Sequence, residues 1–162
     1  MIRIDNPREN DRQITPHFKA SEFACRHCGR TLIDERLVRG LEELRIVKNE
    51  PITITSGYRC IDHPLSNGRE TSQHTIGRAA DFIFGNKFNI IEVFNDILQI
   101  PEIRRIGIYS GGYIHVDTKN EKLYWICYDS QKGKEYRYFN DLTSFYNYVY
   151  NDKRIDWTGI NV

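Results

Sequence analysis

The chain has 162 residues, of which 40% are hydrophobic and 12% aromatic, and this composition is typical of one folded domain rather than a disordered segment. Its 23 basic and 22 acidic residues give a formal net charge of +1, which argues against nucleic-acid binding and gives no reason to expect an anionic membrane as partner. No apolar run of about 18 residues predicts a membrane span, and residues 1–7 lack the apolar stretch of a secretory signal.

The first third of the chain predicts a surface arm, a helix and a strand. Residues 1–20 are polar, so we expect an extended arm along the surface, followed by a short helical turn at 21–23. A helix is predicted from Asp34, its N-cap, to the stop at Pro51, because apolar residues recur at three- and four-residue spacing. These residues are Leu37, Val38, Leu41, Leu44 and Val47. Residues 52–56 alternate apolar and polar side chains, which predicts a half-buried strand.

The rest of the chain predicts further strands, two helices and a long loop. Residues 57–77 form the loop, and loops of this length inside a compact domain are usually functional. Strands are predicted at 79–83, 105–109, 113–117 and 123–128, and helices at 89–98 and 142–150, with a tail at 151–162. Ser110-Gly111-Gly112 indicates a hairpin turn. We therefore expect a single α+β domain over 1–162, with a small, mainly antiparallel sheet and flanking helices. The tyrosines near the C-terminus are interpreted as core packing rather than as a stacking surface for bases or sugars.

The four cysteines leave three interpretations open. Cys25 and Cys28 form one C-x-x-C pair, whereas zinc ribbons carry two, and Cys60 and Cys127 stand apart. The cysteines can be reduced, partly buried thiols, or they can form a disulfide. Alternatively, Cys25 and Cys28 can bind a structural metal together with Cys60 or His27.

Two candidate metal ligands lie at the end of the long loop, in Ser72-Gln73-His74-Thr75-Ile76-Gly77-Arg78-Ala79-Ala80-Asp81. Gly77 permits the tight turn that folds His74 back beside Asp81, and imidazole nitrogens and carboxylate oxygens are both good zinc donors. Asp81 also stands within an apolar run, where a carboxylate is costly unless it is paired or bound to a metal.

The third candidate ligand is His115, in Tyr113-Ile114-His115-Val116-Asp117. Alternate strand residues face the same side, so His115 and Asp117 can reach one site. A set of His74, Asp81 and His115 leaves a fourth position open for water, which distinguishes catalytic zinc from structural zinc. We therefore expect one catalytic Zn²⁺ ion.

Five stretches of the sequence together resemble a known peptidase family. They are Phe18-Lys19-x-Ser21-Glu22-Phe23, Thr55-Ser56-Gly57-Tyr58-Arg59, Ser72-x-His74-x-x-Gly77-x-Ala79-x-Asp81, Gly107-Ile108-Tyr109 and Ile114-His115-Val116-Asp117. The pattern, which covers about residues 17–127, resembles the zinc D-Ala-D-Ala carboxypeptidases. That family includes phage L-alanyl-D-glutamate endopeptidases and shares its metal-site fold with the Hedgehog signalling domain.

The resemblance implies a role for each matching residue. His74, Asp81 and His115 would be the zinc ligands. Arg59 would bind the substrate carboxylate or the developing oxyanion; alternatively, it is a surface arginine that pairs with Glu70 or Asp62. Ser72 would hydrogen-bond near the site and contact substrate, or it is a simple loop cap.

The general base is the point at which the sequence departs from the family. Several members carry an acidic residue three positions before the last histidine ligand, and here that position is Gly112. Asp117 is the nearest carboxylate and is our candidate base, unless it only orients His115. His63 and Asp62 are further candidates to bind or protonate substrate.

Two functions follow from these expectations. The first is a monomeric zinc metallopeptidase that hydrolyses peptidoglycan stem peptides, as a carboxypeptidase or an endopeptidase, with no nucleic-acid partner. The second is a non-catalytic zinc-binding or recognition module of a phage structural protein, which the missing carboxylate at position 112 favours. Because no secretory signal is present, we expect a protein made in the cytoplasm that reaches the cell wall after phage lysis or within a virion.

Overall fold

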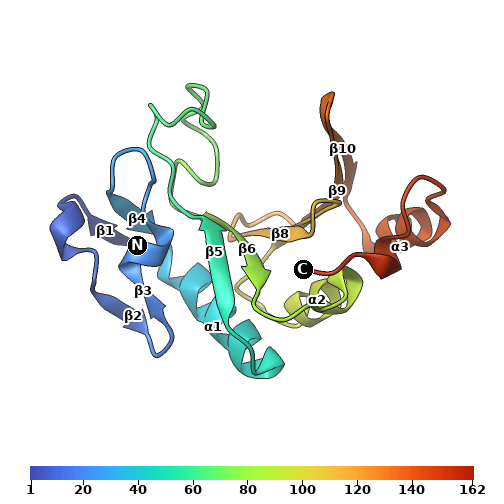
Figure 1. The fold of residues 1–162 in the computed structure, drawn as a ribbon, viewed down its shortest axis with the longest axis horizontal. Helices are drawn as coiled ribbons and strands as arrows, with labels where there is room; N and C mark the ends of the chain where they lie inside the picture. The colour runs from blue at the N-terminus through green and yellow to red at the C-terminus, as the bar shows by residue number, and fades with distance from the viewer.

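A computed structural model describes residues 1–162 of the chain (Figure 1). The strands are β1 (Ile2–Ile4), β2 (Gln13–Thr15), β3 (Phe18–Lys19), β4 (Thr31–Ile33), β5 (Ile52–Ser56), β6 (Ala79–Phe84), β7 (Arg105–Tyr109), β8 (Tyr113–Asp117), β9 (Leu123–Ser130) and β10 (Gly133–Phe139). The α-helices are α1 (Glu35–Lys48), α2 (Ile90–Ile97) and α3 (Leu142–Asn151). Short 3₁₀ turns lie at Pro7–Glu9, Ala20–Phe23 and Trp157–Gly159.

The central feature is a six-stranded sheet in the order β10-β9-β7-β8-β6-β5. The α+β class is as predicted, but the sheet is larger than expected and mixed, since β7 and β9 pair in parallel. The small, mainly antiparallel sheet was inferred by pairing consecutive strands as hairpins. In the structure β9 returns to the opposite edge of β7 from β8, and this crossover makes the β7–β9 pair parallel.

The helices begin and end where the sequence indicates. The side chain of Asp34 accepts a hydrogen bond from the Arg36 amide at 3.1 Å and so caps α1. Helix α1 ends at Asn49, which has a left-handed φ of 50°. Asn89 caps α2 in the same way as Asp34 caps α1. None of the helices has the length and apolar composition needed to cross a bilayer.

Both ends of the chain pack into the fold. The expected surface arm is instead partly structural, because β1 pairs with β4 and Ile2, Ile4 and Phe18 join the core. At the C-terminal end Trp157 is fully buried, and the amide of Val162 donates to the carbonyl of Phe88 at 2.8 Å. Polarity averaged over residues 1–20 concealed these few buried side chains, which is why the arm was predicted.

Strand β10 was not predicted, because its residues are exposed and mostly polar. It pairs along its full length with β9, from Gly133 opposite Ser130 to Phe139 opposite Tyr124. In Figure 1 this hairpin rises on one side of β8, and the green loop between β5 and β6 rises on the other. The cleft described below is lined by residues from both of these segments.

Candidate metal centre

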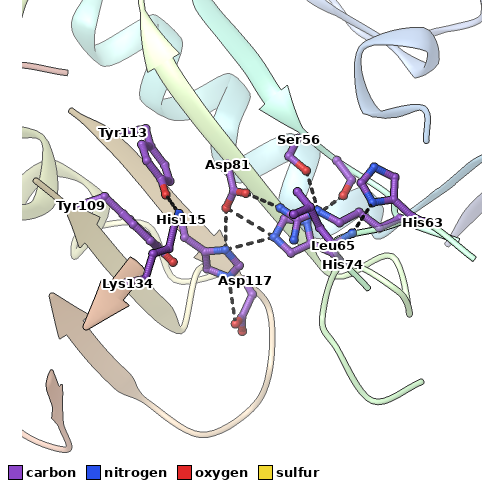
Figure 2. A network of polar contacts seen from close by, with 12 residues as sticks. Ser56, His63, Leu65, His74, Asp81, Tyr109, Tyr113, His115, Asp117 and Lys134 are labelled. Carbon is purple, nitrogen blue, oxygen red and sulfur yellow. Dashed lines mark hydrogen bonds and ion pairs between the residues drawn. The ribbon is translucent and has the colours of Figure 1, made fainter. Parts of the chain in front are cut away.

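Three buried side chains from the loop, β6 and β8 converge on one point (Figure 2). Asp81 and His115 lie directly opposite each other in the antiparallel β6–β8 pair. The Nδ1 atom of His115 lies 2.7 Å from Oδ1 of Asp81, and Nε2 of His74 lies 3.2 Å from Nδ1 of His115 and 3.4 Å from Oδ1 of Asp81. The structure thus brings together His74, Asp81 and His115, as the sequence analysis expected.

The imidazole of His74 is oriented by the backbone of the long loop. Its Nδ1 atom lies 2.7 Å from the carbonyl oxygen of Gly57, which can only accept, so Nδ1 carries the proton. Nε2 therefore presents its lone pair to the convergence point. A metal-binding histidine normally has this arrangement, with its other ring nitrogen donating to a carbonyl or carboxylate.

Arg59 fixes the carboxylate of Asp81. The guanidinium donates from Nη2 to Oδ2 of Asp81 at 2.7 Å and from Nε to Oγ of Ser56 at 2.8 Å. Oδ1, the other oxygen of Asp81, faces the two histidines. Arg59 thus faces the site, and its partner is Asp81 rather than Glu70 or Asp62.

Asp117 lies on the far side of His115 from the other two residues. Its Oδ2 atom is 3.5 Å from Nε2 of His115 and 3.6 Å from Nε of Arg105, and its Oδ1 accepts the amide of Lys119 at 2.9 Å. Asp117 is only 1% exposed. This position suits a carboxylate that orients His115. Orienting His115 was the alternative to the general-base role that we expected for Asp117 from the sequence.

Of the other residues singled out in the sequence, Ser72 lines the cleft, whereas His63 and Gly112 do not. Ser72 lines the cleft beside His74. His63 does not line it; its Nδ1 accepts the amide of Leu65 at 3.1 Å. Gly112 lies in the β7–β8 turn with a φ of +79°, and a Cβ atom there would meet the carbonyl oxygen of Asn161 at 2.7 Å. This position therefore resists the acidic residue that several family members carry.

Charge and burial together set the ionisation states of the three residues. Burial would raise the pKa of Asp81, but the nearby His74 and His115 outweigh it and hold that pKa well below its usual range. Burial lowers the pKa of His74, which keeps it neutral. Burial also opposes charge on His115, but hydrogen bonds and the charges of Asp117 and Asp81 raise its pKa to about 9. A cation bound here would replace the proton between Nδ1 of His115 and Asp81, and Nε2 would keep the proton directed at Asp117.

The convergence point opens into a cleft of about 480 Å³. Aromatic side chains form much of its wall, namely Tyr109, Tyr113, Trp125, Tyr136 and Tyr138. The ring centroids of Trp125 and His115 lie 5.0 Å apart. Tyr109 stacks on Tyr113 with a distance of 4.2 Å between ring centroids. Four cations also line the cleft, namely Arg59, Arg69, Arg105 and Lys134.

The aromatic wall is the part of the site that sequence reasoning missed. Tyr136 and Tyr138 are 39% and 60% exposed, so their interpretation as core residues is wrong, whereas Tyr146 and Tyr148 do pack against the core. The two-residue spacing of Tyr136 and Tyr138 places both on one face of a strand, and it was the available signal. The charged Arg137 between them concealed this spacing.

The donor chemistry of the convergence point fits a zinc ion. Two imidazole nitrogens and one carboxylate oxygen lie within 4.8 Å of one another, and zinc accepts these ligands in sites with three protein donors. A family model described as Peptidase M15 matches residues 16–117, a range that includes all three residues. No curated protein and no solved structure gives a significant match to the chain.

Proposed function

The chain belongs to the peptidase M15 family, and from this premise we propose that it is a zinc metallopeptidase that hydrolyses peptide bonds in peptidoglycan stem peptides. The observation that carries the proposal is the convergence of His74, Asp81 and His115 at the base of a positively charged cleft. When bound there, zinc supplies a Lewis acid that polarises a peptide carbonyl and acidifies water.

The protein's own residues set the geometry of this chemistry. His74 is held by Gly57, Asp81 by Arg59, and His115 by Asp117, so each proposed ligand has a fixing partner. Three protein ligands leave one position of a tetrahedral site for water or substrate. Each ligand therefore enters the reaction already oriented, which limits reorganisation during catalysis.

Substrate recognition follows from the charge of the cleft. Four cations line it, and its two carboxylates, Asp81 and Asp117, already contact Arg59 and Arg105. Stem peptides carry free carboxylates, which these cations complement. Arg59 uses its Nε and Nη2 atoms within the protein and retains further N–H donors for a substrate carboxylate or an oxyanion. The tyrosine wall provides flat apolar surface against which a peptide or sugar can pack.

A second function is favoured by one specific observation. No carboxylate other than Asp81 and Asp117 lines the cleft, and both are already engaged. A general base contributes about 10²–10⁴-fold to rate, so a centre without a free base would hydrolyse slowly or serve recognition instead. The second candidate is therefore a zinc-binding recognition module, such as one carried by a phage particle.

The test is a peptidoglycan digest read by mass spectrometry, with zinc content measured on the same samples. The proposal expects stem-peptide fragments from the wild type, with masses that identify the bond cut. His115→Ala should lose the fragments, and His63→Ala, which removes a histidine outside the cleft, should retain them. Bound zinc without fragments would favour the recognition module. A wild-type centre that binds no zinc would overturn both functions.

A further inference from the structure

A second group of potential metal ligands lies outside the cleft. Cys25 and Cys28 stand between the Ala20–Phe23 turn and β4, and Cys60 follows β5. Their three sulfur atoms lie within 4.8 Å of one another, and none is in a disulfide. We propose that these three cysteines, together with His27, bind a structural zinc ion.

The backbone around Cys25 and Cys28 forms a tight turn that points both thiols at one place. The amide of Gly29 donates to the carbonyl of Cys25 at 2.8 Å, and the amide of Cys25 donates to the carbonyl of Arg30 at 2.8 Å. Gly29 adopts a φ of +72°, which glycine tolerates best. The chain therefore reverses direction directly after Cys28, and this brings the two ends of the C-x-x-C motif together.

Two of the three sulfur atoms receive hydrogen bonds of the kind that stabilise a thiolate. The amide of Cys60 donates to Sγ of Cys25 at 3.3 Å, and Nε of Arg30 donates to Sγ of Cys28 at 3.4 Å. A guanidinium and a backbone amide directed at sulfur stabilise negative charge there. Thiols that only fill an apolar core need neither contact. Cys127 is such a thiol, because it is buried in β9 away from the other cysteines.

The proposed fourth donor is His27, which lies outside the mutual grouping of the three cysteines. Its Nδ1 atom lies 3.4 Å from Sγ of Cys60. Three thiolates and one imidazole make a closed tetrahedral set typical of structural zinc. With Zn–S bonds of about 2.3 Å, tetrahedral geometry separates the sulfurs by about 3.8 Å, which the observed grouping can reach with small side-chain shifts. A disulfide would use only two of the three sulfurs and leave His27 without a role.

This second centre would connect two segments that support the first. The amide of Tyr58 donates to the carbonyl of Phe23 at 2.8 Å, so the two segments already touch. Gly57 and Arg59, which hold His74 and Asp81, lie within three residues of Cys60. A zinc ion bound by the cysteines would thus fix the start of the 57–77 loop, without itself contacting substrate.

The test uses cobalt(II) as a spectroscopic substitute for zinc in the full chain. Thiolate ligands give cobalt an intense near-ultraviolet charge-transfer absorption, which the His74, Asp81 and His115 set cannot produce. The wild type should show this absorption and bind about two metal ions per chain. Cys28→Ser should lose the absorption and one metal, and the matched control Cys127→Ser should lose neither. His115→Ala should lose one metal but keep the absorption, which separates this proposal from the proposed peptidase function.

A second measurement covers the case in which Cys28→Ser does not fold. Alkylation of the native wild type should leave Cys25, Cys28 and Cys60 protected until a strong chelator removes the metal. An intact mass that reveals a disulfide among them would overturn the proposal. Wild-type protein without thiolate-to-cobalt absorption, or with equal alkylation before and after chelation, would also overturn it.

Discussion

The role of Asp117 can be tested by the isosteric change Asp117→Asn. The carboxylate lies 3.5 Å from Nε2 of His115, whereas the Nδ1 atom of that ring faces Asp81. Asparagine keeps the shape and can still accept the Lys119 amide, which Asp117 now accepts at 2.9 Å. It removes the negative charge that favours a proton on Nε2 of His115, and it leaves Arg105 without its anionic neighbour.

The magnitude follows from the geometry. A residue that orients a metal-binding histidine contributes about 10–100-fold to metal affinity, which corresponds to about 1.4–2.7 kcal/mol. We therefore expect Asp117→Asn to weaken zinc binding by about that factor. A general base would behave differently, because its loss would lower turnover by about 10²–10⁴-fold and leave metal affinity intact.

Zinc competition against a chromophoric chelator measures the affinity, and hydrolysis at saturating zinc measures the turnover. Asp152→Asn is the matched control, since the Asp152 side chain is only 3% exposed and accepts hydrogen bonds from Tyr128 and Trp157 away from the centre. Unchanged zinc affinity in Asp117→Asn, together with a large loss of turnover at saturating zinc, would refute the orienting role and restore Asp117 as the base.

Three further changes test neighbouring parts of the account. Arg59→Gln removes the cation that contacts the buried carboxylate of Asp81. The free energy of unfolding of the metal-free protein in urea should therefore fall by about 1–3 kcal/mol. An unchanged urea midpoint would contradict that pairing. Gly112→Glu places a side chain where φ is +79° and the Asn161 carbonyl is close. Calorimetry should therefore show a lower thermal midpoint, and a hydrolysis assay should show no gain in rate. A variant that is as stable as the wild type and hydrolyses faster would contradict this expectation. Asp34→Ala should cost about 1 kcal/mol at pH 7 through loss of the α1 cap. Burial opposes the charge on Asp34, but its hydrogen bonds hold the pKa below the ordinary 3.8, so the cap's contribution is complete above about pH 4 and is lost as the pH falls further. Urea midpoints of wild type and variant should therefore converge in acid, and a constant difference would count against the assignment.

Local patterns predicted the ligands well. His74 and Asp81 are seven positions apart in one loop-to-strand segment, and the cost of burying a lone carboxylate made Asp81 conspicuous. His115 joins them because β8 pairs with β6 in the register that places it opposite Asp81. Both strands are buried on both faces, so the sequence predicts the two strands but does not display this register directly.

Long-range contacts were not visible in the sequence. The parallel β7–β9 pair depends on which edge of β7 the chain returns to, and no local pattern specifies that. Strand β10 has exposed, charged residues, so its place in the sheet is set by pairing with β9 rather than by burial. The grouping of Cys60 with Cys25 and Cys28 likewise depends on the contact between Phe23 and Tyr58.

Asp117 can act as a general base or as the residue that orients His115. The orientation of the His115 ring bears on this choice, because the ring nitrogen that does not face the metal site contacts the orienting residue. His115 presents Nδ1 to Asp81 and Nε2 to Asp117. The sequence placed His115 and Asp117 on one strand face but could not specify how the ring is turned. The orientation of that imidazole is therefore the detail that only the structure supplies.

The most direct test of the central claim is anomalous X-ray diffraction at the zinc edge from crystals of the zinc-loaded protein. We predict a peak about 2.0–2.2 Å from Nε2 of His74, Oδ1 of Asp81 and Nδ1 of His115. A map without a peak between these three atoms, or with zinc bound to Asp117 in place of one of them, would contradict it.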